Sequence, residues 1–200
     1  MKKYELTEET KVISGKTLFR IRALRSFGDI KAGDLGGFIE NERNLSHGGN
    51  AWVGDNAQVG GNAEVYGDAQ VVGYARVGGY ARVGGYARVG GYARVDGDAW
   101  VGGYARVGGY ARVDGDARVN GDGLINSNND YLCEQGLGSR NRSASFFKCK
   151  DGHIHVLCGC FSGNLDEFEN KVKEEHGNSK YSKEYLGFIE VVKTHFEVRQ

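Results

Sequence analysis

Residues 51–122 read AWVGDN AQVGGN AEVYGD AQVVGY ARVGGY ARVGGY ARVGGY ARVDGD AWVGGY ARVGGY ARVDGD ARVNGD, twelve six-residue units with no insertion between them. Repetition at a short fixed period is typical of stacked units, none of which can bury a core alone. Valine at the third place of every unit supplies an inward β-branched wall, and alanine at the first place fits where the chain turns a corner. The sequence therefore predicts a mainly β fold, a parallel β-helix.

The coil geometry follows from the six-residue period. Glycine at the fifth place of nearly every unit fits a corner that needs positive φ. Three hexads would close one triangular coil, so the twelve hexads would make four coils. With parallel strands about 4.8 Å apart, they would form a prism roughly 20 Å long.

The hexads resemble those of hexapeptide-repeat solenoids. Together with the preceding segment GDLGGFIEN (33–41), they resemble the YdcK-type β-solenoid proteins of bacteria, phages and prophages. The resemblance covers about residues 30–128 and implies a left-handed winding, which the usual right-handed crossover rule does not predict. It also implies a phage- or prophage-like origin.

Residues 1–32 are expected to form an N-terminal β cap, 33–128 the solenoid and 129–200 a small C-terminal α+β module. In the cap, strands at 11–14 and 17–24 would flank a turn at Gly15–Lys16 and cover the open end of the solenoid.

The C-terminal module is expected to hold one hairpin and two helices. Strands at 143–150 and 153–159 would be joined by a two-residue type I′ turn, Asp151–Gly152. The helices are amphipathic, the first capped by Asn164 and ending at Gly177, the second beginning near Lys180.

The overall composition gives the chain no net charge that would favour one class of charged partner. Lys plus Arg and Asp plus Glu are 26 each, so there is no global attraction to nucleic acid or to a membrane. The sequence shows no signal-peptide pattern, in which a charged segment precedes an apolar one, and no apolar segment long enough to cross a membrane. We therefore expect a cytoplasmic protein of a bacterium or a phage-infected cell. The four cysteines are expected to be reduced thiols.

A catalytic site is not expected. Hexapeptide acyltransferases typically trimerise and use a histidine near the subunit interface, yet no histidine lies between 48 and 152. His47 is the one weak candidate for a general base, and it would need an acceptor hydroxyl within reach. We expect no cofactor, because a shared fold does not imply the acyltransferase activity.

Cysteines and histidines near the C-terminus suggest zinc. A two-residue turn, however, would pair Cys149 with Ile154 and Ser145 with Cys158, which places the two thiols about 13 Å apart along the strands. Buried thiols are then the better interpretation, and no metal is expected. The residues concerned are Cys133, Cys149, Cys158, Cys160, His153 and His155.

An acidic ladder is the second candidate metal site. Asp96 and Asp98 would stack on Asp114 and Asp116 one coil later. Such carboxylates disfavour each other's ionised form unless something compensates them. We expect solvent or the neighbouring arginines to do so, with a calcium ion as the alternative.

Residues eighteen apart should stack in neighbouring coils, which predicts ligand-binding ladders on the surface. Stacked cations repel one another, so we expect anions or aromatic faces nearby to offset the repulsion. The arginine columns would be Arg76, Arg94 and Arg112; Arg88 and Arg106; and Arg82 and Arg118 with Trp100 between them. The tyrosine columns would be Tyr74, Tyr92 and Tyr110, and Tyr86 and Tyr104.

The function predicted is a non-enzymatic binding or assembly protein whose Arg/Tyr ladders hold an anionic, nucleotide-like ligand or a partner protein, and which could antagonise a host system. A homotrimeric acyltransferase that uses acyl-coenzyme A, and a structural spacer or virion component, remain the alternatives. A homo-oligomer, dimer or trimer, is expected, because exposed tyrosines make repeating contact surfaces. No membrane partner is expected, and nucleic acid stays open.

Overall fold

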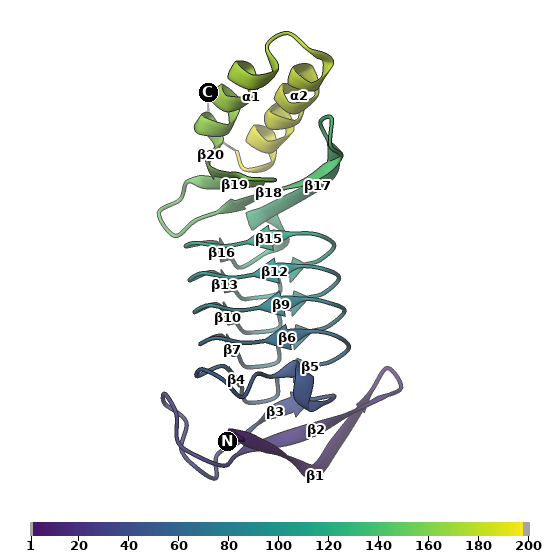
Figure 1. Cartoon of the computed structure of the whole chain (residues 1–200), viewed down its shortest axis with the longest axis vertical. Helices are drawn as coiled ribbons and strands as arrows, with labels where there is room; N and C mark the ends of the chain where they lie inside the picture. The colour runs from purple at the N-terminus through teal and green to yellow at the C-terminus, as the bar shows by residue number, and fades with distance from the viewer. Residues whose placement is uncertain (1, 198–200) are drawn as a thin grey trace.

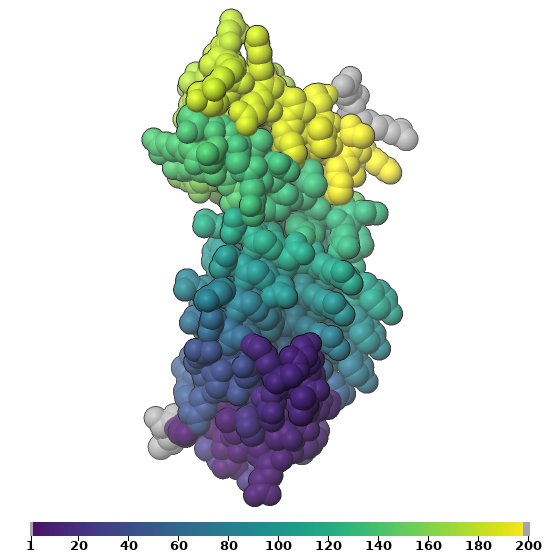
Figure 2. All heavy atoms as spheres, turned by 90° about the vertical axis from the view of Figure 1, so that its right-hand side faces the viewer, coloured from purple at the N-terminus to yellow at the C-terminus, as the bar shows by residue number. Residues whose placement is uncertain are grey.

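The chain forms a column with a β-hairpin at one end and two helices at the other, as Figure 1 shows for the computed structural model. The structure describes residues 2–197. Figure 2 shows that the column is continuous, with the hairpin in purple and the helices in yellow at opposite ends.

Each hexad contributes one two-residue strand, made of the variable second residue and the valine. These strands are β4 (Trp52–Val53), β5 (Gln58–Val59), β6 (Glu64–Val65), β7 (Gln70–Val71), β8 (Arg76–Val77), β9 (Arg82–Val83), β10 (Arg88–Val89), β11 (Arg94–Val95), β12 (Trp100–Val101), β13 (Arg106–Val107), β14 (Arg112–Val113) and β15 (Arg118–Val119), and β16 (Leu124–Ile125) follows them. Every third strand pairs in parallel with its counterpart one coil away.

The coils create three parallel sheets. Sheet I holds β5, β8, β11 and β14 and continues through β3 (Leu35–Ile39); sheet II holds β4, β7, β10, β13 and β16; sheet III holds β6, β9, β12 and β15. The parallel β-helix expected from the sequence is confirmed, while the left-handed sense of the winding stays a prediction.

The interior is the alternating wall of valine and alanine. Val83, Val89 and Ala93 are completely buried, and so are nearly all their repeat equivalents. Each fully buried valine stabilises the fold by about 1.5–3 kcal/mol relative to an exposed one. At the corners the fifth-place glycines have positive φ, for example +68° at Gly97, where an added Cβ would lie 2.8 Å from the backbone of Gly115. Glycine is therefore required both by conformation and by the close approach of the next coil.

Outside the strand ladders themselves, the backbone hydrogen bonds between coils run in one direction along the column. The N–H of the first residue of each strand donates to a carbonyl of the following coil, as from Arg76 N to Ala93 O at 2.9 Å. For these bonds, the first coil therefore leaves carbonyl oxygens without donors, and the last coil leaves N–H groups without acceptors. A stable solenoid needs donors at its N-terminal end and acceptors at its C-terminal end.

The N-terminal segment supplies side-chain donors. Asn44, in the short 3₁₀ helix η1 (Glu42–Asn44), donates through Nδ2 to the carbonyls of Gly61 (3.1 Å) and Ala63 (2.8 Å). Lys3 donates through Nζ to Ala51 O at 2.7 Å. Both side chains are completely buried, and burial, with the Arg25 charge, lowers the pKa of Lys3 to about 8.

The C-terminal segment supplies the matching acceptors. Asn128, in the 3₁₀ helix η2 (Asn128–Asp130), accepts through Oδ1 from Arg112 N at 2.8 Å. Ser145 accepts through Oγ from Arg118 N, also at 2.8 Å. At these positions the N-terminal segment donates to solenoid carbonyls and the C-terminal segment accepts from solenoid N–H groups.

The hairpin of the N-terminal cap extends sheet I. β1 (Tyr4–Ile13) and β2 (Lys16–Ala23) are antiparallel, β2 pairs with β3, and β3 pairs in parallel with β5. Their turn is Ser14–Gly15, with φ of +51° and +76°, one residue earlier than expected. The role of covering the open end is as predicted.

The C-terminal module places a four-stranded antiparallel sheet between the solenoid and the helices. Its strands are β17 (Tyr131–Leu137), β18 (Arg142–Lys148), β19 (Ile154–Cys158) and β20 (Phe161–Asn164). Phe147 packs on the solenoid core, whereas Phe146 packs with α1 (Leu165–His176) and α2 (Lys180–His195). The predicted helix starts and the stop at Gly177 are confirmed; β17 and β20 had no counterpart in the sequence prediction.

The predicted pairing of the hairpin is wrong by one residue. Lys148 pairs with Ile154, and Cys149 N donates to His153 O at 2.9 Å. The turn is the three-residue loop Lys150–Asp151–Gly152, in which Gly152 has a φ of +91°. The opposed pairs expected for Cys149 with Ile154 and for Ser145 with Cys158 therefore do not form.

Candidate functional site

The predicted surface ladders form. Register pairs join Arg76 to Arg94 and Arg94 to Arg112 in sheet I, Arg88 to Arg106 in sheet II, and Trp100 to both Arg82 and Arg118 in sheet III. All seven arginines are exposed and Trp100 is half-buried. Their role in binding a ligand stays a prediction.

The tyrosine columns also form, but they stack on one another. Tyr74, Tyr92 and Tyr110 lie with ring centroids 5.1 and 5.2 Å apart, and Tyr86 lies 5.0 Å from Tyr104. Within residues 2–197 the cation–π contacts all lie in the two terminal segments, so cover of the repeat arginines by tyrosine rings, as the sequence suggested, is not seen. The columns are aromatic surfaces in their own right.

In sheet III two aromatic rings lie close over glycine backbones. A Cβ added at Gly84 would lie 2.3 Å from the Tyr66 ring, and one at Gly102 would lie 2.7 Å from the Trp100 indole. Both glycines are buried beneath these rings. Trp100 Nε1 donates to Tyr66 Oη at 3.2 Å, which fixes the two rings relative to each other. Tyr66 and Trp100 thus form an aromatic floor.

Charged side chains surround this floor in a hollow of about 630 Å³. Arg82 and Arg118 lie on either side of Trp100 in the ladder. Arg82 Nε is 3.9 Å from Glu64 Oε2, a solvent-exposed ion pair that contributes little and can be exchanged for another anion. Asp98 also lines the hollow and offers a carboxylate to hydrogen-bond donors.

The hollow continues toward the C-terminal module. Asp98, Trp100 and Arg118 also line a second hollow of about 850 Å³, which reaches Arg142 of β18 and Phe161 of β20. We call the two hollows together the sheet III groove. It brings three arginines, an indole and several carboxylates to one surface.

The remaining arginines lie apart from the groove. Arg112 lines a separate hollow beneath Tyr131, whose hydroxyl is 3.4 Å from Asp114 Oδ1. Arg76 and Arg94 lie on sheet I, and Arg88 and Arg106 lie on sheet II, outside the groove.

Sequence reasoning missed Tyr66, Glu64 and Arg142. Two signals were available: AEVYGD is the one unit with an aromatic residue at its fourth place, and Glu64 and Trp100 are departures from the repeat that fall on one eighteen-residue column. Departures from a repeat that align in one column mark a surface with its own chemistry. Arg142 lies beyond the repeat, so no column predicted it.

The acidic ladder does not gather as a metal site among the described residues. Asp96 Oδ1 accepts from Gly97 N at 2.9 Å, within its own corner, and Asp98, Asp114 and Asp116 are exposed. No ion pair joins these carboxylates to the repeat arginines in residues 2–197. Exposure to solvent, one of the expected outcomes, describes them.

His47 is packed inside the N-terminal cap. Its ring stacks on Tyr4 with centroids 4.4 Å apart, and its Nδ1 accepts from Lys3 N at 3.2 Å. Its Nε2 lies 3.8 Å from Glu42 Oε2. These contacts give His47 a place in the packing that holds Lys3 against the first coil.

The four cysteines are free thiols in four different environments. Cys149 is buried on the solenoid side of the terminal sheet and Cys158 on its helix side, whereas the two-residue turn expected from the sequence would have placed both on one face. Cys160 is exposed, which corrects the expectation of a buried thiol, and Cys133 lies 3.7 Å from Ser145 Oγ.

Comparison with known proteins adds no family. No protein-family model matches the chain, and no curated protein matches it. Neither described helix is long and apolar enough to cross a membrane. The YdcK-type and phage resemblance therefore stays a prediction from the repeat.

Proposed function

We propose that this β-solenoid is a non-enzymatic binding protein whose sheet III groove holds an anionic planar ligand, a nucleotide. The observation that carries the proposal is the aromatic floor of Tyr66 and Trp100, with Arg82 and Arg118 as the ladder neighbours of the indole.

The groove offers one partner for each part of a nucleotide. The exposed part of the Trp100 ring can stack on a base, which contributes about 1–3 kcal/mol per base. Arg118 and Arg142 present guanidinium groups, which suit phosphate because they donate two parallel hydrogen bonds. Asp98 and Asp116 can accept from ribose hydroxyls or exocyclic amines.

Rigidity favours binding over chemistry in this site. Each strand of sheet III is hydrogen-bonded to neighbouring coils, and the floor is locked by the Trp100–Tyr66 contact, so little conformational freedom is lost when a ligand binds. The resemblance to phage-type solenoids gives this binding a setting, an infected bacterial cell in which a sequestered nucleotide would antagonise a host system. The stacked tyrosine columns, at the two corners that border sheet II, leave separate surfaces for a homo-oligomer.

The test is calorimetric titration of the whole chain with adenosine triphosphate, guanosine triphosphate and a cyclic dinucleotide. Adenosine, which lacks phosphate, and ribose 5-phosphate, which lacks a base, should each bind more than about tenfold more weakly than the best nucleotide, because each loses one class of contact. Loss of the stacking surface in Trp100→Ala should weaken binding about 5- to 150-fold.

Charge reversal at repeat-equivalent positions provides the matched control. Arg118→Glu should weaken binding at least about tenfold, since it replaces a charge-assisted hydrogen bond with repulsion. Arg94→Glu occupies the same place in its hexad but lies on sheet I, and should leave the affinity within about twofold. The proposal fails if no nucleotide binds, or if the two variants weaken binding equally.

A further inference from the structure

One cluster of metal-ligating side chains lies outside the sheet III groove. Cys149, His153 and His155 each offer a ligand atom, and the three atoms lie within 4.8 Å of one another, the one such group in residues 2–197. The three-residue turn creates it, because Cys149 stands opposite His153 and the period of two along a strand returns His155 to the same face.

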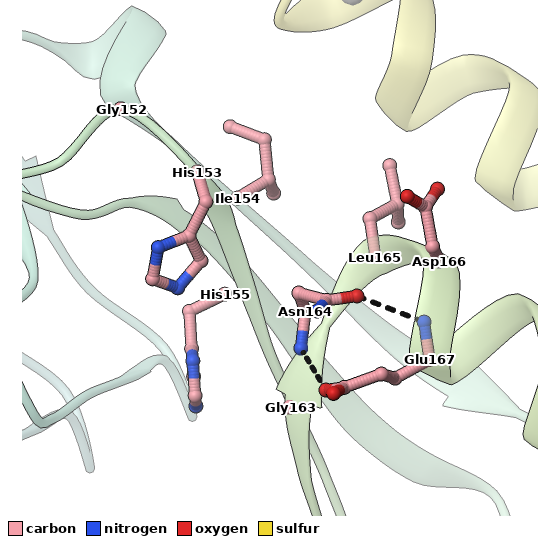
Figure 3. Close-up of a pocket in the computed structure, with 9 residues that line it drawn as sticks. All are labelled: Gly152, His153, Ile154, His155, Gly163, Asn164, Leu165, Asp166 and Glu167. Carbon is pink, nitrogen blue, oxygen red and sulfur yellow. Dashed lines mark hydrogen bonds between the residues drawn. The ribbon is translucent and has the colours of Figure 1, made fainter.

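The histidine rings are already oriented by neighbouring side chains. His153 Nδ1 lies 2.5 Å from Asp151 Oδ1, which leaves Nε2 available as a metal ligand. His155 Nε2 lies 2.9 Å from Ser162 Oγ, which leaves Nδ1. Figure 3 shows both imidazoles projecting to one side of the strand, while Ile154 projects to the other, toward the helices.

We propose that Cys149, His153 and His155 form a zinc site, with a solvent molecule in the fourth position. A thiolate with two imidazoles is a donor set that suits Zn²⁺. A metal-binding histidine usually donates a hydrogen bond from its second ring N–H to a carboxylate, a backbone carbonyl or water. Asp151 already lies in this position beside His153 Nδ1. When the metal binds, the Cys149 thiol releases its proton to solvent and the sulfur becomes a thiolate ligand.

The required rearrangement is small. Tetrahedral zinc with its usual bond lengths separates its ligand atoms by about 3.3–3.6 Å, so the group must contract by at most about 1.5 Å. His153 is exposed and His155 half-buried, so side-chain rotation can provide this movement while the hairpin backbone stays in place.

The location indicates what the metal would do. Cys149 forms a bridge to Gly123, and Lys150 N donates to Asp122 O at 3.1 Å, so the hairpin end rests on the last turn of the solenoid. A metal bound there fixes the register of the hairpin and holds the C-terminal module against the column. This role is independent of the nucleotide site, because none of the three ligands lines the sheet III groove.

The experiment is titration of the reduced, chelator-stripped whole chain with Zn²⁺ in competition with a chromophoric chelator, and with Co²⁺ followed by absorption. We expect one metal ion per chain, a thiolate-to-cobalt charge-transfer band, and intense d–d bands from a tetrahedral site. Zn²⁺ at about 100 times its Kd should raise the Tm by roughly 5–10 °C.

Variants separate the site from adventitious binding. His153→Gln, His155→Gln and Cys149→Ser should each abolish stoichiometric binding, and Asp151→Asn should weaken it about 10- to 100-fold. His176→Gln and Cys160→Ser carry the same residue changes outside the cluster and should bind as the parent does. Because His153 is exposed, its variant should fold even if Cys149→Ser does not. The proposal is overturned if the parent binds no metal, if His153→Gln binds as tightly as the parent, or if the cobalt spectrum lacks the thiolate band.

Discussion

Replacement of Asn44 tests the idea that carbonyls of the first coil depend on side-chain donors from the N-terminal cap. The N-terminal end must supply donors, and Asn44 Nδ2 supplies two of them, to the carbonyls of Gly61 and Ala63. Its Oδ1 also accepts from Asn41 N at 3.0 Å. The side chain is completely buried, and its bond to the Ala63 carbonyl is buried as well, whereas the Gly61 carbonyl also lies 3.4 Å from Arg43 Nη2.

The magnitude follows from these contacts. Each buried acceptor that loses its donor costs about 1–3 kcal/mol, so Asn44→Ala should lower the free energy of unfolding by about 2–5 kcal/mol. For a chain of this length the Tm should fall by roughly 5–15 °C. Asn44→Asp nearly preserves the shape and retains an acceptor for Asn41 N, but places a carboxylate oxygen against two carbonyls. It should therefore destabilise the protein at least as much as Asn44→Ala.

Urea unfolding followed by tryptophan fluorescence is the assay, because Trp52 lies in the first coil and is buried against Phe27. Hydrogen exchange of the first coil should accelerate more than that of the last, since repeat arrays lose structure from a weakened end. Asn50→Ala is the control; its exposed hydrogen bond to Asp68 should contribute less than about 0.5 kcal/mol. If Asn44→Ala is as stable as Asn50→Ala, the donor argument is refuted.

Two further predictions concern Lys3 and the aromatic floor. Since Lys3 has a pKa of about 8 in the folded chain and about 10.4 when unfolded, the unfolded state binds more protons between these values, and stability should rise with pH there. From pH 7.5 to 9.5 the parent should gain about 2 kcal/mol relative to Lys3→Met in paired urea titrations; no difference in slope would contradict the burial of a charged amine. Gly84→Ala should displace the Tyr66 ring, destabilise the protein by about 1–3 kcal/mol and shift the fluorescence of Trp100. Gly90→Ala is the control, because its added Cβ would have its nearest contact at 3.5 Å, and it should change neither stability nor fluorescence. Equal effects of the two variants would mean that the aromatic floor is not packed on Gly84.

The hairpin of the C-terminal module illustrates how sequence reasoning failed locally. A two-residue Asp-Gly turn is a strong hairpin signal, but here the glycine takes the left-handed position of a three-residue loop. The residue pattern of β18 did not reveal the correct register, because Ala144, Ser145, Phe146 and Phe147 are all buried. A strand covered on both faces has no alternating pattern from which to read its register. One residue of slip moved Cys149 to the opposite face and thereby hid the cluster with His153 and His155.

The sequence by itself determined the solenoid, its strand positions and every surface column, because a strict hexad period makes residues eighteen apart neighbours in space. It determined the helix ends for a similar reason, since the Asn164 cap and the Gly177 stop act locally. Only the tertiary structure decided which sheet is hollowed, since Tyr66 and Trp100 come from different coils and meet over Gly84 and Gly102. It also decided the metal-ligating cluster, because strand register is set by packing on both faces of the sheet and not by the turn alone.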